Sequence, residues 1–188
     1  MSMRLNLPNS ITLFRIALIP LFVIVFYLPV SWANVAATII FFIACVSDWV
    51  DGYLARSMQQ ESPFGAFLDP VADKLMVVVV IVLLVEANPS IYVALPSIVI
   101  VAREISVSAL REWMAQIGSS TTVKVSFIGK AKTTAQMLAL GFMIFAEPLM
   151  GIPNFQVGLA IYYIAAILTI VSMVIYLRAA WPVLTREG

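Results

Sequence analysis

The stretch DWVDGYLARSMQQESPFGAFLDPVADK, residues 48–74, contains every aspartate of the 188-residue chain. Asp48 and Asp51 are three residues apart near the end of one apolar run, and Asp69 and Asp73 are four apart near the start of the next. Residues with these spacings share one face of a helix, with Cβ atoms about 5–6 Å apart. Because the link between the two runs is short, we expect antiparallel neighbouring helices whose four carboxylates converge at one depth.

The rest of the chain is strongly apolar. Hydrophobic residues make up 62% of it and charged residues only 11%, and the mean hydropathy is +1.02. An ordinary soluble domain has about 25% charged residues, and a globule this small must cover itself with polar groups. We therefore predict an all-α polytopic membrane protein. The net charge of +1 gives no reason to expect nucleic-acid binding.

Six stretches are long enough to cross a membrane, for which about 20 mostly apolar residues are needed. They cover residues 11–27, 33–56, 64–85, 91–114, 127–146 and 156–177. The connections between them are short and no repeat is evident. We therefore expect six transmembrane helices in a single membrane domain over residues 1–188.

The basic residues predict the orientation of these helices. The loops around Leu28, Asn88 and Gly151 contain no Lys or Arg, and all eleven basic residues lie at or toward the other side. Cytoplasmic loops carry the excess of Lys and Arg. Both termini should therefore be cytoplasmic, an N-in/C-in topology.

Four carboxylates in this setting need compensating charge, since even one charged side chain at the bilayer centre costs about 2.5 kcal/mol or more. The chain has no histidine, and its one cysteine, Cys45, lies in an apolar run as a small hydrophobic residue would. Hard oxygen ligands alone favour Mg²⁺ or Mn²⁺. We expect two divalent cations, an arrangement that suits phosphoryl transfer.

Two other interpretations of the aspartates remain. They could form a helix-end cluster that faces cytoplasmic water. Alternatively, the protein could be a cation or proton transporter that uses intramembrane carboxylates. Transporters usually place such residues near the midplane, often in paired repeats, whereas these four cluster toward one side.

The aspartate stretch resembles the signature of the CDP-alcohol phosphotransferase family, D-x2-D-G-x2-A-R-x8-G-x3-D-x3-D, at all eight fixed positions from Asp48 to Asp73. The resemblance extends over nearly the whole chain. Within the family, the segments LPNSITLFRI, FGAFLDPVADK, AREISVSALREWM and GKAKTTAQM are similar to the bacterial phosphatidylglycerophosphate synthases.

This resemblance implies the six-helix fold of the family, often a homodimer, in the bacterial cytoplasmic membrane, with its active site facing the cytoplasm among membrane lipids. It also implies a reaction. A hydroxyl of sn-glycerol 3-phosphate attacks the β-phosphorus of CDP-diacylglycerol, giving phosphatidylglycerophosphate and CMP. The aspartates alone do not separate this acceptor from phosphatidylglycerol (a cardiolipin synthase), serine or inositol phosphate.

The family pattern also implies roles for residues of the motif. Asp48, Asp51 and Asp69 would bind the metals, and Asp73 would be the general base and a further metal ligand. The donor nucleotide would be bound by residues at the start of the chain and along the motif: Asn9, Thr12, Gly52, Ala55, Arg56 and Gly65. The alternatives are helix capping for the first two, interfacial anchoring for the arginine, and close helix packing for the small residues.

An acceptor with a phosphate dianion needs cationic side chains, and the arginine fork suits phosphate. We expect it to be bound by residues beyond the motif, Arg103, Arg111, Lys130 and Lys132. The alternative is that these residues only anchor the cytoplasmic side. Glu104 would orient an arginine or form an ion pair alone.

Overall fold

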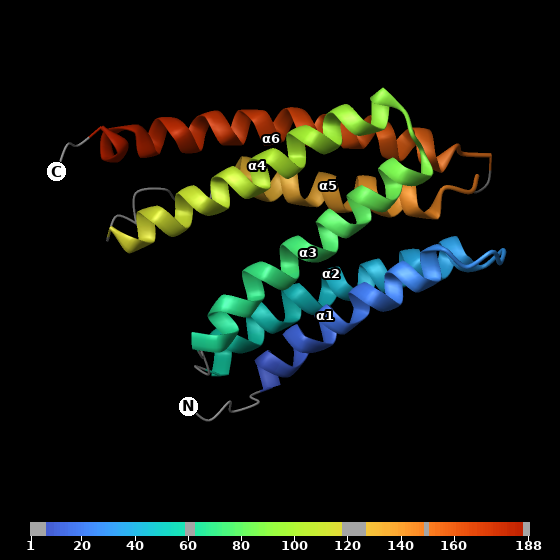
Figure 1. The fold of residues 1–188 in the computed structure, drawn as a ribbon, viewed down its shortest axis with the longest axis horizontal. Helices are drawn as coiled ribbons and strands as arrows, with labels where there is room; N and C mark the ends of the chain where they lie inside the picture. Colours follow the sequence, from blue (N-terminus) through green and yellow to red (C-terminus); the bar gives the residue numbers. More distant parts are fainter. Residues whose placement is uncertain (1–6, 59–62, 118–126, 149–150, 186–188) are drawn as a thin grey trace. The chain divides into compact units, whose positions relative to one another are not determined.

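The computed structural model describes residues 7–58, 63–117, 127–148 and 151–185. The side chains of residues 7–9, 48–58, 63–70, 73, 127, 128, 130, 183 and 184 lie outside this description. The described residues form six α-helices and no strand (Figure 1): α1 (Leu7–Phe26), α2 (Ala33–Met58), α3 (Pro63–Ala87), α4 (Ile91–Gln116), α5 (Phe127–Phe145) and α6 (Asn154–Leu184). Each predicted apolar stretch coincides with one helix, so the all-helical prediction is confirmed.

The largest difference from the predicted bounds is at the end of α6. The helix continues to Leu184, seven residues beyond the predicted end at residue 177. Hydropathy falls at Arg178, but arginine and the two alanines that follow are strong helix formers. An apolar span and a helix therefore end at different residues here.

The chain divides into two compact units. The first comprises Met1–Leu84 with Gly141–Phe155, and the second comprises Val85–Leu140 with Gln156–Gly188. The prediction of a single domain stays a prediction.

In the first unit, α1 and α2 pack against each other and are joined by the short turn at residues 27–32. The apolar side chains of Phe22, Phe41 and Val80 are fully buried in this unit. Gly141 lies against the ring of Phe42, and a Cβ atom at position 141 would be 2.6 Å from its Cζ atom. The absence of a side chain at Gly141 thus allows this close approach.

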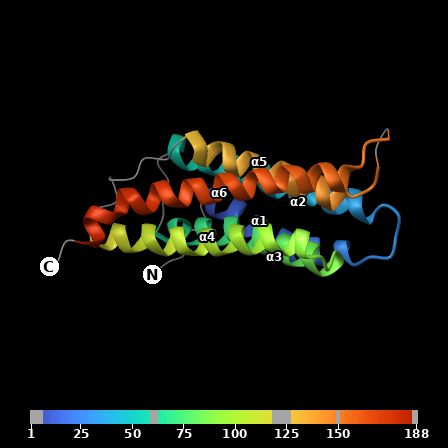
Figure 2. The same cartoon turned by 90° about the horizontal axis from the view of Figure 1, so that it is seen from above.

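In the second unit, α4 and α6 run side by side (Figure 2). A buried polar contact joins them: the Ser97 and Tyr162 hydroxyl oxygens are 3.1 Å apart, and the Ser97 hydroxyl also donates to the Val93 carbonyl at 2.7 Å. The first turn of α4 is capped by Ser90, whose side chain accepts a hydrogen bond from the Tyr92 N–H. The contact between Ser97 and Tyr162 fixes the register of α4 against α6.

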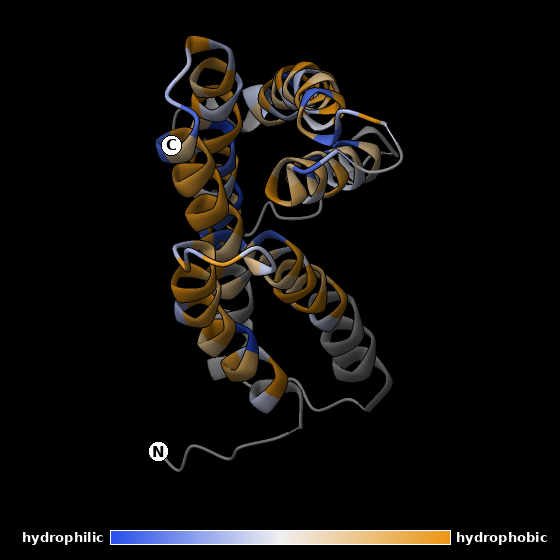
Figure 3. Cartoon of the chain, turned by 90° about the vertical axis from the view of Figure 1, so that its right-hand side faces the viewer, coloured by the Kyte–Doolittle hydropathy of each residue, from blue (hydrophilic) through white to orange (hydrophobic). Residues whose placement is uncertain are grey.

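Apolar side chains cover much of the outer surface of both units. Figure 3 colours most of the described helical residues on the hydrophobic side of its scale, and large side chains such as Ile24, Ile98 and Ile167 are more than half exposed. By length and composition, the helical segments Ile91–Gln116 and Asn154–Pro182 could each cross a membrane. Two shorter apolar helical segments, Ser10–Phe26 and Ala33–Ser47, accompany them.

Candidate active site

The acidic motif, defined as Asp48, Asp51, Asp69 and Asp73, is divided between two helices. The first pair lies in the last part of α2 and the second pair in the first part of α3. Four residues connect these helices, so Met58 and Pro63 are at most about 18 Å apart. The two halves of the motif therefore occupy connected helix ends.

The helix bounds place the aspartates at two levels along these axes. Asp48 precedes Met58 by ten residues and Asp73 follows Pro63 by ten. At 1.5 Å per residue, each is about 15 Å from the helix end next to the link. Asp51 precedes Met58 by seven residues and Asp69 follows Pro63 by six, which places both about 9–11 Å from the same ends. Each half of the motif thus contributes one aspartate at each level.

The four aspartate side chains lie outside the described residues. Among the side chains that are described, no group of three or more His, Cys, Asp or Glu residues could hold a metal ion. The donor set of the acidic motif is nevertheless chemically consistent with hard divalent cations, since it offers carboxylate oxygens only and the chain has no histidine.

The residues predicted to bind the donor nucleotide lie on the three helices of the first unit. Asn9 and Thr12 are on α1, Gly52, Ala55 and Arg56 follow Asp51 on α2, and Gly65 precedes Asp69 on α3. Only Thr12 has a described side chain, and it is buried. The nucleotide roles of all six residues stay predictions.

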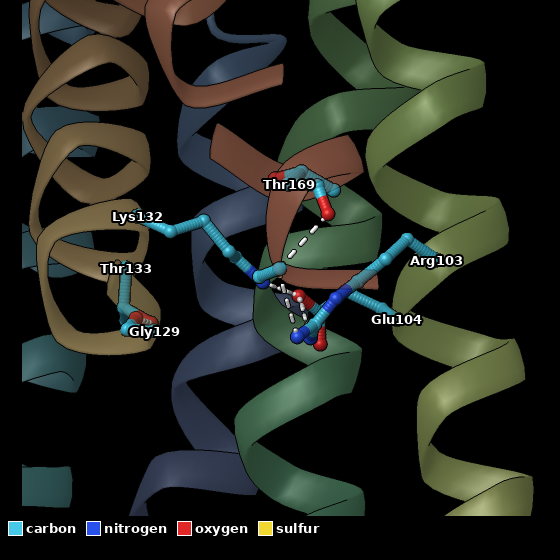
Figure 4. Close-up of polar contacts among 7 residues, drawn as sticks. Arg103, Glu104, Gly129, Lys132, Thr133 and Thr169 are labelled. Carbon is cyan, nitrogen blue, oxygen red and sulfur yellow. Dashed lines mark hydrogen bonds and ion pairs between the residues drawn. The ribbon is translucent and has the colours of Figure 1, made fainter. Parts of the chain in front are cut away.

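Two of the four residues predicted to bind the acceptor phosphate meet in the second unit. Arg103 from α4 and Lys132 from α5 both contact the Glu104 carboxylate (Figure 4). The Arg103 Nη1 atom is 3.5 Å from Glu104 Oε1, and Lys132 Nζ donates to the same oxygen. We call these three residues the cationic cluster. Two cations and one carboxylate give it a net charge of +1, and the Lys132 side chain is almost fully buried.

Helix α6 holds the guanidinium of Arg103 from a further side. Arg103 Nη2 donates to the Ser172 hydroxyl at 3.1 Å, and that hydroxyl donates to the Thr169 carbonyl at 2.9 Å. The Arg103 Cζ atom also lies 5.8 Å from the centre of the Tyr176 ring, within cation–π range. The orientation of this guanidinium is thus fixed by two helices.

The other two predicted acceptor residues are not part of this cluster as described. Arg111 lies on the same helix as Arg103, eight residues later, and its side chain is exposed. Lys130 lies in the first turn of α5, and its side chain is outside the described residues. Their acceptor roles stay predictions.

Comparison with known proteins places these features in a family. A family model described as CDP-alcohol phosphatidyltransferase matches residues 5–177. The chain belongs to the CDP-alcohol phosphatidyltransferase family. Proteins of Shigella flexneri serotype 5b (strain 8401) and Escherichia coli (strain K12) are each 52% identical to it over 181 residues, which cover 95% of this chain and 96% of each relative. Both relatives bear the name CDP-diacylglycerol–glycerol-3-phosphate 3-phosphatidyltransferase.

Sequence reasoning identified the family's aspartate signature but missed the polar residues that surround Arg103. Thr169, Ser172 and Tyr176 lie in a run that otherwise reads as a plain apolar span. The signal that could have found the first two is their spacing, because two hydroxyl residues three apart share one helix face. Gln136, one turn after Lys132 on α5, was also overlooked although it is a buried amide in an apolar helix.

Proposed function

We propose that this protein transfers the phosphatidyl group of CDP-diacylglycerol to sn-glycerol 3-phosphate, releasing CMP and forming phosphatidylglycerophosphate. The observation that carries this proposal is the 52% identity, over 95% of the chain, to relatives named for that reaction. The eight fixed residues of the family signature, Asp48 to Asp73, support the same chemistry. A transporter function outside the family has no comparable support.

Two divalent cations, Mg²⁺ or Mn²⁺, would be held by Asp48, Asp51 and Asp69, with Asp73 as a further ligand. When bound, such ions neutralise the carboxylates and stabilise the charge that develops on the phosphates. The arrangement of the acidic motif at two levels of α2 and α3 is consistent with this role.

The proton of the attacking hydroxyl goes to Asp73 in this mechanism. The acceptor oxygen then forms a bond to the β-phosphorus, and the bond from that phosphorus to the oxygen of CMP breaks. With no histidine in the chain, a carboxylate is the natural general base. The nucleotide would be bound by Asn9, Thr12, Gly52, Ala55, Arg56 and Gly65, which lie on α1, α2 and α3.

Arg103, Arg111, Lys130 and Lys132 would bind the phosphate of the acceptor. The support for this role is that Arg103 and Lys132 bring two cationic groups together in the second unit, because cationic side chains favour an anionic ligand. Arginine provides the bidentate fork, and lysine adds a point charge.

The proposed setting is the bacterial cytoplasmic membrane, with six spans, both termini and the active site on the cytoplasmic side, and a homodimeric assembly of single-domain chains. The membrane setting and its orientation are supported by three observations: two helices of the described residues are long and apolar enough to cross a membrane, many apolar side chains are exposed, and three loops contain no Lys or Arg.

The test is to supply the purified full-length protein with CDP-diacylglycerol, Mg²⁺ or Mn²⁺, and one acceptor at a time. We expect CMP release with glycerol 3-phosphate and a product identified as phosphatidylglycerophosphate by mass spectrometry. Phosphatidylglycerol, serine and inositol phosphate serve as competing acceptors. A preference for one of these would change the assigned acceptor, and the absence of CMP release with all four would contradict a transferase of this kind.

A further inference from the structure

Three buried polar atoms of the second unit have no hydrogen-bond partner in the part of the chain that the structure describes. They are Arg103 Nε on α4, Gln136 Oε1 on α5 and Thr169 Oγ1 on α6. The Gln136 side chain is only 3% exposed and Thr169 is 0% exposed. A buried polar group without a partner costs about 1–3 kcal/mol, so three of them in one unit require an explanation.

Arg103 is part of the cationic cluster, Thr169 is tied to it through Ser172, and Gln136 lies one turn after Lys132 on α5. Arg103 uses Nη1 for Glu104 and Nη2 for Ser172, which leaves Nε. Thr169 is one turn from Ser172 on α6, and its backbone carbonyl accepts the Ser172 hydroxyl. Figure 4 shows Thr169 beside the point where Arg103, Glu104 and Lys132 converge. Gln136 follows Lys132 by four residues on α5 and so shares its helix face.

The chemistry of these groups defines a ligand. Arg103 and Lys132 bring two cationic groups to the cluster, and cationic side chains suit an anion. Arg103 Nε is a donor, Gln136 Oε1 is an acceptor, and the Thr169 hydroxyl can act as either. A phosphate ester satisfies the donor but not the amide oxygen, which needs a ligand that itself carries a hydrogen-bond donor. A phosphorylated polyol offers both kinds of group.

We propose that Gln136 and Thr169 form a hydroxyl-binding subsite that selects the polyol part of the acceptor, next to the phosphate held by Arg103 and Lys132. This inference rests on the proposed function. Glycerol 3-phosphate has two hydroxyl groups, of which one attacks the donor and the other, on the middle carbon, remains. The subsite binds the remaining hydroxyl, so Gln136 and Thr169 determine specificity and take no part in the bond that forms.

The experiment compares two acceptors in the full-length enzyme. Glycerol 3-phosphate has the middle hydroxyl, and 3-hydroxypropyl phosphate lacks it. Because a hydrogen bond to a buried partner is involved, the wild-type enzyme should favour glycerol 3-phosphate roughly tenfold to a hundredfold in kcat/KM. Gln136→Met and Thr169→Val should lower kcat/KM for glycerol 3-phosphate by a similar factor and leave that for the analogue nearly unchanged.

Two further variants separate specificity from packing. Thr169→Ser retains the hydroxyl and should restore most of the preference for glycerol 3-phosphate. Ser97→Ala removes a buried hydroxyl of the same unit that bonds Tyr162, away from the subsite, and should leave the ratio between the two acceptors unchanged.

Equal losses with both acceptors in Gln136→Met and Thr169→Val would overturn the subsite and show a packing role. A wild-type enzyme that uses both acceptors equally would overturn it as well, even if neither variant folds. A wild-type enzyme that makes no lipid from glycerol 3-phosphate, while releasing CMP with another acceptor, would instead contradict the proposed function on which the subsite rests.

Discussion

The acidic motif and the cationic cluster have opposite charge and are assembled in different ways. The motif gathers four aspartates within 26 residues on two consecutive helices. The cluster joins α4 to α5 across 28 residues of sequence and to α6 across 69. The proposed metal site needs closely spaced ligands, which neighbouring helical turns supply, whereas the proposed acceptor site needs groups from several helices. We therefore expect changes in the motif to affect turnover and changes in the cluster to affect acceptor binding.

The largest effect should come from the acidic motif. Asp73→Asn removes the proposed base and should lower kcat by roughly 10²–10⁴-fold, the usual contribution of general acid–base catalysis. Binding of CDP-diacylglycerol should persist, because the carboxylates of Asp48, Asp51 and Asp69 remain. Asp48→Asn should weaken the binding of Mg²⁺ or Mn²⁺ and the binding of CDP-diacylglycerol together. Measurements of kcat and of CDP-diacylglycerol affinity at different metal concentrations distinguish the two variants. Near-normal turnover in Asp73→Asn would show that another group takes the proton.

A change in the cationic cluster should have a smaller effect, and on the KM for glycerol 3-phosphate rather than on kcat. Arg103→Ala removes one of its two cations and reduces its net charge from +1 to 0. Hydrogen bonds to charged groups contribute about 1.5–3 kcal/mol, so the apparent KM for glycerol 3-phosphate should rise by roughly one to two decades. The KM for CDP-diacylglycerol should change much less, and Lys at position 103 should restore only part of the loss.

The control for that variant is Arg178→Ala, which removes an exposed arginine from α6 without touching the cluster. Its KM values should match those of the wild-type enzyme. If Arg103→Ala weakened the binding of CDP-diacylglycerol and left the binding of glycerol 3-phosphate unchanged, the cationic cluster would serve the donor rather than the acceptor. If neither KM changed, Arg103 would only anchor the helix at the membrane surface.

Ser172 tests whether α6 positions the guanidinium. Ser172→Ala removes the hydrogen bond to Arg103 Nη2 while leaving both cations in place. A typical intramolecular hydrogen bond contributes about 0.5–1.5 kcal/mol, so the KM for glycerol 3-phosphate should rise about threefold to tenfold. Ser172→Thr keeps the hydroxyl and should stay close to the wild-type value. Combined with Arg103→Ala, the Ser172→Ala change should add nothing, and additive losses would show that Ser172 acts independently of Arg103.

The fold and the motif were largely predictable, since both depend on local sequence. Apolar runs bounded by Pro29, Pro63 and Pro89 gave six helices, and the fixed spacing of the aspartates identified the family. The partners of Arg103 were not predictable in this way. Ser172 contacts it only because α4 and α6 pack in a particular register, and no local pattern in either helix sets that register.

The smallest expected effect lies outside both regions and concerns stability alone. A Cβ atom at position 141 would be 2.6 Å from Phe42 Cζ and 2.9 Å from its Cε2 atom, so Gly141→Ala forces the ring to shift. Overpacking typically destabilises a protein by about 1–3 kcal/mol, whereas replacing glycine by alanine within a helix stabilises it by about 0.5–1 kcal/mol. We expect the free energy of unfolding to fall by about 0–2.5 kcal/mol, seen as a lower midpoint of thermal unfolding in detergent.

Phe42→Leu in the same chain removes the ring that the new methyl group meets. The double variant should therefore be more stable than the sum of the two single changes predicts, because the clash that Gly141→Ala creates is absent from it. Simple additivity would show that Gly141 is not held against Phe42. Unlike variants of the acidic motif and the cationic cluster, Gly141→Ala should change neither kcat nor the KM for glycerol 3-phosphate at a temperature where the protein is folded. A change in either constant would mean that packing within the first unit is coupled to the chemistry, and that stability and turnover cannot be assigned to separate parts of the molecule.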